Sequence, residues 1–283
     1  MDALSQLSYS PNQVVPRHAK ELRQTGSGRV AENPAQSSRS PFIRVPYGTA
    51  RIPPELPPPP RLRYHIPMPR QHSEFPNLVV FDHPLIQHKV TLMRDRATSG
   101  QTFRALLIQI AGLMTFEVTR SFSTEFVMVE TPLERAKGSR VAEKITICPV
   151  LRAGLAMAEG ILELIPEARV GHLGMFRDEK TLKPVQYLLR LPKDLDAGPV
   201  VLVDPMLATG GSASEAIRML REHGARDIRM ICLVAAPEGV RRMLRDHPDL
   251  TIYAAALDRE LNANGFILPG LGDAGDRLYG TGA

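Results

Sequence analysis

The sequence of 283 residues is poor in cysteine and has no long apolar run. Its two cysteines, Cys148 and Cys232, lie in apolar, strand-like segments, so we expect buried thiols rather than a disulfide framework or a metal cluster. No apolar run approaches the roughly 18 to 20 residues that span a membrane, and the N-terminus lacks the apolar stretch of a secretory signal. These absences predict a globular, cytoplasmic protein with no membrane partner.

Several catalytic patterns are also missing. No G-x-x-x-x-G-K-[ST] segment occurs, which excludes the phosphate loop of nucleoside triphosphatases. The residues Gly270, Gly272 and Gly275 satisfy G-x-G-x-x-G, but only eight residues follow them, too few for the βαβ unit that a dinucleotide fingerprint opens. No Ser/His/Asp or Cys/His arrangement predicts a covalent nucleophile.

The formal charge of +5 is concentrated in the N-terminal quarter. Residues 1–75 hold ten Lys or Arg, five Asp or Glu and 13 of the 25 prolines, whereas the remaining chain has 25 basic and 25 acidic residues. A segment of this composition cannot bury enough apolar surface to offset the entropy lost when it orders, so residues 1–74 are predicted to be a largely disordered extension. It is either a plain appendage or a segment for docking or organelle targeting. The neutral remainder, residues 75–283, is the predicted folded domain, and its balance argues against a nucleic-acid partner.

Apolar runs alternate with helical patterns in the predicted domain. Two helices, in HPLIQHKVTLMRD and SGQTFRALLIQIAGLMTFEVTRSF, precede the sheet, and a polar hairpin is expected in EFVMVETPL and the neighbourhood of Gly138. Strands are predicted in KITICPV, RVGHLGMF, VQYLLRL, PVVLVD, IRMICLVAA and LTIYAAAL, and helices in GLAMAEGILELI, SASEAIRMLREHG and PEGVRRMLRDH. This alternation predicts an α/β fold with a doubly wound, mostly parallel sheet, whose ligands bind beyond the carboxyl ends of the strands.

The segment VLVDPMLATGGSAS joins one of these strands to a helix. Thr209, Gly210, Gly211 and Ser212 offer backbone N–H groups, hydroxyls and a helix N-terminus, which suits a phosphate monoester. Asp204 precedes the turn and suits the hydroxyls of the sugar that carries the phosphate. An ordinary helix start capped by Ser212 is the alternative, but it explains neither the Asp nor the Thr.

Two further loops carry arginines. Arg152 follows the strand KITICPV, where its guanidinium is either a surface charge or a fork for diphosphate. Arg177 begins the charged run RDEKTLK between two strand-like segments. This run is either a solvated hairpin tip or an arm that reaches an anionic substrate.

Together these motifs resemble the uracil phosphoribosyltransferase family of the type I phosphoribosyltransferase superfamily. The resemblance rests on HPLIQHKVTLMRD, PVLRAGLAMAEG, DPMLATGGS, APEGV and GFILPGLGDAGDRLYGT, and it covers the chain from about residue 77 onward. The alternative within the superfamily is a phosphoribosyltransferase for another base. It is disfavoured because Pro205 stands where most phosphoribosyltransferases have a second acid. The resemblance implies a phosphoribosyltransferase-type fold, with a C-terminal base-binding loop region, that converts uracil and 5-phosphoribosyl 1-diphosphate (PRPP) to UMP and diphosphate.

The resemblance also implies site residues and partners. The resemblance assigns catalytic roles to Asp204, Arg152 and Asp273, of which Asp273 either helps to accept the uracil N1 proton or only positions its loop or the metal. Uracil would contact Ile267, Gly272, Asp273 and Ala274. The PRPP site would comprise Arg152, Arg177, Asp204, Pro205, Met206, Leu207, Ala208, Thr209, Gly210, Gly211, Ser212 and Asp273. The family uses Mg²⁺ with the diphosphate substrate rather than a resident metal, is usually oligomeric, and responds to GTP in some members. A catalytically weak uracil or nucleotide sensor on the same fold, with the tail docking a partner, is the alternative from another class.

Overall fold

The computed structural model describes residues 72–177 and 184–281. All of them belong to one compact unit, residues 58–283. The predicted extension lies almost entirely outside the described residues, so its boundary at residue 74 stays a prediction.

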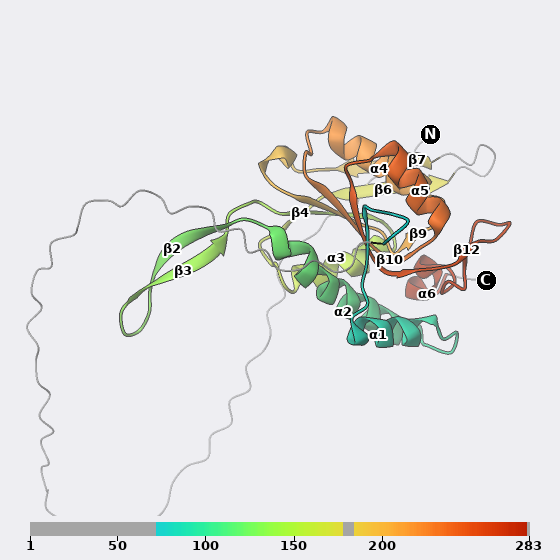
Figure 1. Ribbon diagram of the computed structural model, residues 1–283, viewed down its shortest axis with the longest axis horizontal. Helices are drawn as coiled ribbons and strands as arrows, with labels where there is room; N and C mark the ends of the chain where they lie inside the picture. The colour runs from blue at the N-terminus through green and yellow to red at the C-terminus, as the bar shows by residue number, and fades with distance from the viewer. Residues whose placement is uncertain (1–71, 178–183, 282–283) are drawn as a thin grey trace, which may run out of the picture. The chain divides into compact units, whose positions relative to one another are not determined.

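The described residues form a central sheet with helices on both faces (Figure 1). Neighbouring strands are parallel except for the antiparallel pair β6–β7, which confirms the predicted doubly wound, mostly parallel architecture. Two-residue strands extend the sheet, because β5 (Arg169–Val170) pairs with β4 and β9 (Met206–Leu207) pairs with β10. The order is β1 (Leu78–Val80), β11 (Thr251–Leu257), β10 (Ile228–Ala235), β8 (Val200–Val203), β4 (Thr146–Leu151), β6 (His172–Arg177) and β7 (Pro184–Arg190).

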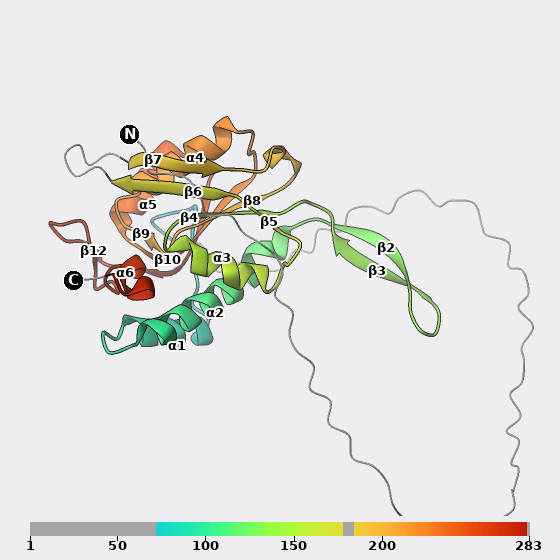
Figure 2. The same cartoon turned by 180° about the vertical axis from the view of Figure 1, so that it is seen from behind.

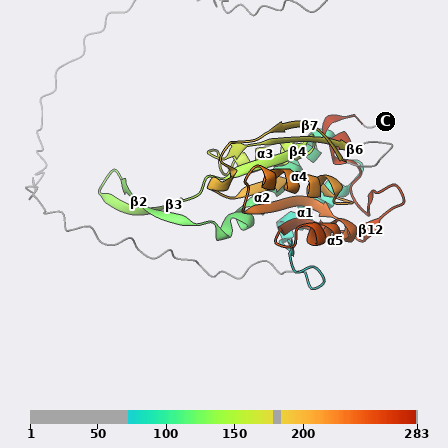
Figure 3. The same cartoon turned by 90° about the horizontal axis from the view of Figure 1, so that it is seen from above.

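Each face of the sheet supports its own hydrophobic core. Alternate residues of β8 divide between the two cores: Val201 and Val203 belong to one, and Val200 and Leu202 to the other. Because both faces are covered, the strand is apolar throughout, as the run PVVLVD predicts. Helices α1 (Pro84–Arg94), α2 (Gly100–Val118) and α3 (Gly154–Leu162) cover the first face, and α4 (Gly211–Glu222) and α5 (Pro237–Asp246) the second (Figures 2 and 3).

The predicted helices are confirmed, and local chemistry explains their ends. Pro84 occupies the first turn of α1, and the Ser99 side chain accepts a hydrogen bond from the Thr102 N–H at the start of α2. By length and composition α2 and the turn after it are apolar enough to cross a membrane, a segment that the sequence analysis overlooked. Its buried stripe packs into the core with the sheet and α3, so α2 is a core helix of this domain.

The N-terminal order differs from the prediction. Strand β1 precedes the two helices and pairs with β11 at the edge of the sheet, whereas both helices were expected before any strand. The strand has three residues, too few for a periodic pattern to stand out. The expected polar hairpin is confirmed as β2 (Thr124–Glu130) and β3 (Arg135–Val141), which projects away from the sheet.

The last part of the chain forms small elements at the carboxyl edge of the sheet. They are the antiparallel pair β12 (Glu260–Leu261) and β13 (Ile267–Leu268) and the short helix α6 (Ala274–Tyr279). Short 3₁₀ turns occupy Thr119–Ser121 and Leu195–Ala197. The chain after β4 enters α3 on one face, and the chain after the adjacent β8 enters α4 on the other. In doubly wound sheets such a divergence of neighbouring connections marks the crevice where ligands bind, so the strand order locates the expected ligand crevice beyond β4 and β8.

Candidate active site

Asp204 lies where predicted, at the end of β8. Its Oδ1 accepts a hydrogen bond from the Met206 N–H at 3.3 Å. Burial raises the pKa of the Asp204 carboxyl to about 7, the Met206 N–H works in the opposite direction, and the negative charge of Asp273 raises the pKa further. The coupling brings together two acids that are 69 positions apart in the sequence.

Arg152 follows β4 and meets the C-terminal segment. Its Nη2 lies 3.4 Å from the Thr281 hydroxyl, and its guanidinium lies over the Tyr279 ring, 5.4 Å from the centroid. The Tyr279 hydroxyl donates to the Arg152 carbonyl at 3.1 Å. A Cβ at Gly275 would lie 3.2 Å from the Asp273 Oδ1 and 3.9 Å from the Arg152 Nη2, so Arg152 and Asp273 flank one small space. The exposed guanidinium is thus held at the crevice rather than lying free on the surface.

Asp273 also caps α6. Its Oδ1 accepts a hydrogen bond from the Asp276 N–H at 2.9 Å. This contact fixes the start of α6, and the role of Asp273 towards uracil stays a prediction. Its carboxylate remains exposed to solvent beside Arg152.

The predicted phosphate turn leads directly into α4. Helix α4 has Gly210 at its N-cap with φ of +73°, a left-handed conformation that favours glycine, and no side chain caps it. The alternative of an ordinary helix start capped by Ser212 is therefore wrong. The Gly211 N–H lies 3.5 Å from the Thr209 hydroxyl. The turn thus presents a helix N-terminus with glycine at its N-cap and the Thr209 hydroxyl beside its first N–H group.

The sheet and α5 hold this turn in place. The Pro205 carbonyl accepts hydrogen bonds from the Leu233 and Val234 N–H groups of β10, both at 3.0 Å. A Cβ at Gly239 of α5 would lie 2.4 Å from the Ala208 carbonyl oxygen, so only glycine permits this approach. The turn is therefore packed against α5 and hydrogen-bonded to β10.

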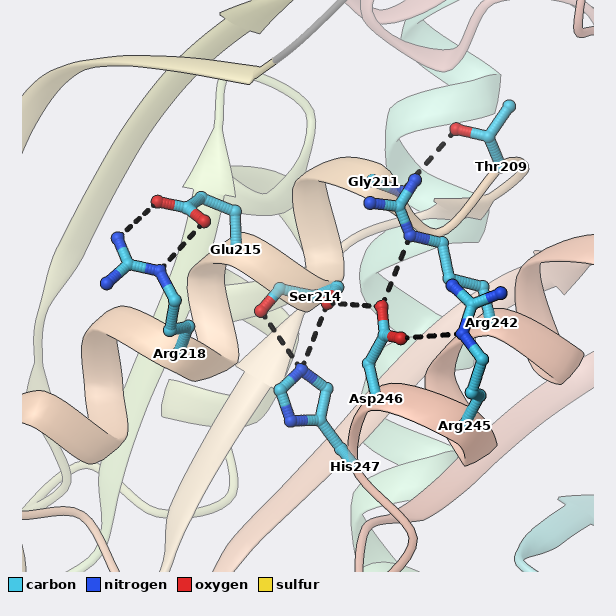
Figure 4. Close-up of polar contacts among 9 residues, drawn as sticks. All are labelled: Thr209, Gly211, Ser214, Glu215, Arg218, Arg242, Arg245, Asp246 and His247. Atoms are coloured by element: carbon cyan, nitrogen blue, oxygen red, sulfur yellow. Dashed lines mark hydrogen bonds and ion pairs between the residues drawn. The ribbon is translucent and has the colours of Figure 1, made fainter.

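Arg242 is a charged neighbour of the turn that the sequence analysis missed. Its Nη1 would lie 3.3 Å from a Cβ at Gly211, and its Nε donates to Asp246 at 3.4 Å (Figure 4). A helical spacing along α5 does not reveal which residue faces a loop from another strand, so no sequence signal singles this arginine out. The guanidinium adds positive charge beside the predicted phosphate turn.

A Ser/His/Asp cluster, which the sequence analysis did not foresee, lies on the outer side of α4. Ser214 Oγ donates to Asp246 at 3.0 Å and lies 3.1 Å from the His247 Nε2 (Figure 4). In a hydrolytic triad the acid contacts the other imidazole nitrogen, but His247 Nδ1 is buried without a partner among the described residues. Burial lowers the pKa of His247, the effect of the Ser214 backbone being smaller and opposite. The cluster ties α4 to the end of α5 and lacks the order of a nucleophilic triad.

The remaining predicted residues divide between described and undescribed parts. Ile267 is buried in β13, and Gly272 and Ala274 flank Asp273 at the start of α6. Arg177 ends β6, next to β4 in the sheet, but its side chain and the predicted arm beyond it lie outside the described residues. The structure thus brings Arg152, Asp204 and Asp273 together.

No group of three or more metal-ligating His, Cys, Asp or Glu side chains occurs among the described residues. Both cysteines are buried free thiols, as expected, and burial raises the pKa of Cys148 to about 12.

Comparisons with known proteins agree on one family. The family description "Uracil phosphoribosyltransferase" matches residues 79–281. A uracil phosphoribosyltransferase of Bacillus pumilus is 57% identical over 203 residues, which cover 71% of this chain and 97% of the relative. The enzyme of that name from Bacillus cytotoxicus is 54% identical over 205 residues, covering 72% and 98%. The solved structure of the AQ2163 protein from Aquifex aeolicus is 38% identical, has a TM-score of 0.70, and covers 73% of this chain and 99% of its own.

Proposed function

Because the chain belongs to the uracil phosphoribosyltransferase family, we propose that it transfers the 5-phosphoribosyl group of PRPP to N1 of uracil, giving UMP and diphosphate in pyrimidine salvage. The observation that carries this proposal is the convergence of Arg152, Asp204 and Asp273 at the carboxyl edge of the sheet. The reaction breaks the bond between the anomeric carbon and diphosphate. Positive charge then develops on the ribose and negative charge on the leaving group.

The turn from Asp204 to Ser212 binds the sugar phosphate. The 5-phosphate accepts hydrogen bonds from the N-terminal N–H groups of α4, with Arg242 beside them. Asp204 accepts hydrogen bonds from the ribose hydroxyls, which favours its ionised form because such donors stabilise a carboxylate. Holding both ends of the ribose orients the anomeric carbon and removes entropy from the barrier.

Arg152 and Arg177 bind the diphosphate from the strands β4 and β6. Their positive charge stabilises the leaving group as its bond to the ribose breaks. The two coupled carboxylates, Asp204 and Asp273, fit the mode in which Mg²⁺ is held by one or two acids together with substrate phosphates. When bound with PRPP, Mg²⁺ would neutralise part of the diphosphate charge.

The loop from Ile267 to Ala274 binds uracil through its backbone. Uracil presents two carbonyls and two N–H groups, and the Gly272 N–H makes no hydrogen bond to any other described residue. A 4-amino group would meet a donor where an acceptor is needed, so cytosine is rejected at a cost of about 1 to 3 kcal/mol for each unpaired polar group. Asp273 lies at the end of this loop and is the candidate acceptor for the N1 proton.

The test is a UMP-forming assay of the purified protein with Mg²⁺, PRPP and radiolabelled base. Uracil, orotate, hypoxanthine and cytosine are compared together, and we expect product from uracil alone. Asp204→Asn should lose most of the rate because the ribose hydroxyls lose a carboxylate acceptor. Retained uracil binding without any product would favour the sensor instead.

Three finer properties implied by the family are part of the proposal. The enzyme works as a homo-oligomer, needs Mg²⁺ with PRPP, and has GTP as its candidate activator; its proposed compartment is the cytoplasm. Size measurement by light scattering, chelation of Mg²⁺ and titration of GTP in the same assay test them separately.

A further inference from the structure

An ion pair outside the proposed catalytic groups lies under the uracil loop. Arg94 ends α1, and Asp258 follows β11 directly. Arg94 Nη1 donates to Asp258 Oδ2 at 2.8 Å and Nη2 donates to Oδ1 at 2.6 Å, a parallel two-bond pairing. The Asp258 side chain is buried, at 5% exposed, and the Arg94 side chain is partly buried, at 24%, so the two-bond geometry is held within the packed structure.

Both members of the pair also bind the backbone of Gly270. Arg94 Nη1 donates to the Gly270 carbonyl at 2.7 Å, and the Gly270 N–H donates to Asp258 Oδ2 at 2.8 Å. Gly270 has φ of +61°, and a Cβ there would lie 2.2 Å from the Ile267 carbonyl oxygen. The pair therefore fixes a tight turn that only glycine can form.

This turn separates the two parts of the proposed uracil site, Ile267 on one side and Gly272 to Ala274 on the other. The next carbonyl, that of Leu271, accepts a hydrogen bond from Arg277 Nη1 at 2.9 Å, and Arg277 Nη2 donates to the Asp95 carbonyl at 2.7 Å. The uracil loop, Ile267 to Ala274, is thus anchored on the end of α1 and on the residue after it. The turn from Asp204 to Ser212, which binds PRPP, instead follows β8 directly and is hydrogen-bonded to β10.

We propose that Arg94 and Asp258 are positioning residues that set the geometry of the uracil loop and thereby the affinity for the base. The proposal rests on the proposed function, because it assigns a role within the same site. Neither side chain touches a substrate; both act through Gly270. Loosening the pair displaces the backbone groups that recognise uracil, and it leaves the turn that binds PRPP in place.

The experiment compares Arg94→Lys and Asp258→Asn with the wild type and with Arg104→Lys. Arg104 also pairs with a carboxylate, through a single contact of its Nη2 with Glu159 Oε1 at 2.5 Å, but this pair lies on the surface between α2 and α3. For both variants of the pair we expect the KM for uracil to rise about tenfold. The KM for PRPP and the kcat at saturating uracil should stay within about twofold of wild type, because the donor turn has its own supports and Asp273 is held separately by its hydrogen bond at the start of α6. Arg104→Lys should change none of these constants.

A purely structural pair gives a different result. The melting temperature and the amount of active protein would fall while the KM for uracil stayed at its wild-type value, and that outcome overturns the proposal. Arg94→Lys keeps the charge and decides the question if Asp258→Asn does not fold. A wild type that forms no UMP would refute the proposed function instead. Uracil binding measured by equilibrium dialysis would then decide the role of the pair, and an equal dissociation constant in wild type and variant would overturn it.

Discussion

Asp204→Asn should stabilise the protein while it removes activity. An aspartate carboxyl ordinarily has a pKa of 3.8, and burial raises the pKa of Asp204 to about 7 in the folded chain. Between these values the folded state binds a proton that the unfolded state has released. The stability of the wild type therefore falls as the pH rises through this window and levels off above about pH 7. Asparagine does not titrate, so the variant escapes this loss.

The structure sets the size of the gain. Each pKa unit corresponds to about 1.4 kcal/mol, so a shift from 3.8 to about 7 gives an upper limit of about 4.5 kcal/mol. Asp204 keeps some contact with solvent, which reduces the penalty, and we expect about 1 to 3 kcal/mol. For a domain of this size that is an increase in melting temperature of about 3 to 8 °C at pH 8.

The assay is thermal unfolding of wild type and variant at pH 5, 6, 7 and 8. The difference in melting temperature should grow with pH and stop growing above about pH 7. Asp194→Asn is the control with the opposite sign, because hydrogen bonding to Lys144, and then to Arg169, lowers the pKa of Asp194. Its loss should lower the melting temperature at pH 8. A melting temperature for Asp204→Asn at or below that of wild type, or a difference that ignores pH, would refute the reasoning.

Three further outcomes are expected. Asp273→Asn removes a like charge that raises the pKa of Asp204, so the ascending limb of the pH profile of kcat/KM for PRPP should move to lower pH; an unmoved limb would show that the two acids are not coupled. Arg242→Ala should raise the KM for PRPP about threefold to tenfold, because a cation beside the phosphate turn is lost. Arg245→Ala is the control, since Arg245 is exposed and also pairs with Asp246, and it should leave the KM unchanged. Equal effects of the two substitutions would contradict the role of Arg242. Deletion of residues 1–74 should leave turnover largely intact, and a dead truncation would show that this segment completes the site or the oligomer.

The sequence predicts the sheet well because its signals are local. The run PVVLVD alternates between two cores, and the lone Asp204 marks where the chain leaves the sheet. The same reasoning finds Arg152, since a charged residue directly after an apolar run must lie at the carboxyl edge. The position of each of these two residues can be predicted from the apolar residues directly before it in the sequence.

Contacts between distant segments leave no such signal. Arg94 and Asp258 are 164 positions apart, and each looks like an ordinary surface charge until α1 is packed against the end of β11. Arg242 is one of several arginines on α5, and only the packing of α4 against α5 distinguishes the one that faces the turn. Strand β1 is missed for a related reason, because three residues become a strand only through pairing with β11.

The separate supports of the two halves of the site bear on how such an enzyme evolves. The donor turn is held by β10 and α5, and the base loop by the end of α1 and by Asp258. Substitutions in the segment from Asp258 to Gly272 can therefore accumulate without disturbing the turn that holds the phosphorylated sugar, whereas Asp273 interacts with Asp204 and belongs to both halves of the proposed site. A lineage can exchange one acceptor base for another by altering this segment alone, and the turn that binds the phosphorylated sugar is inherited unchanged.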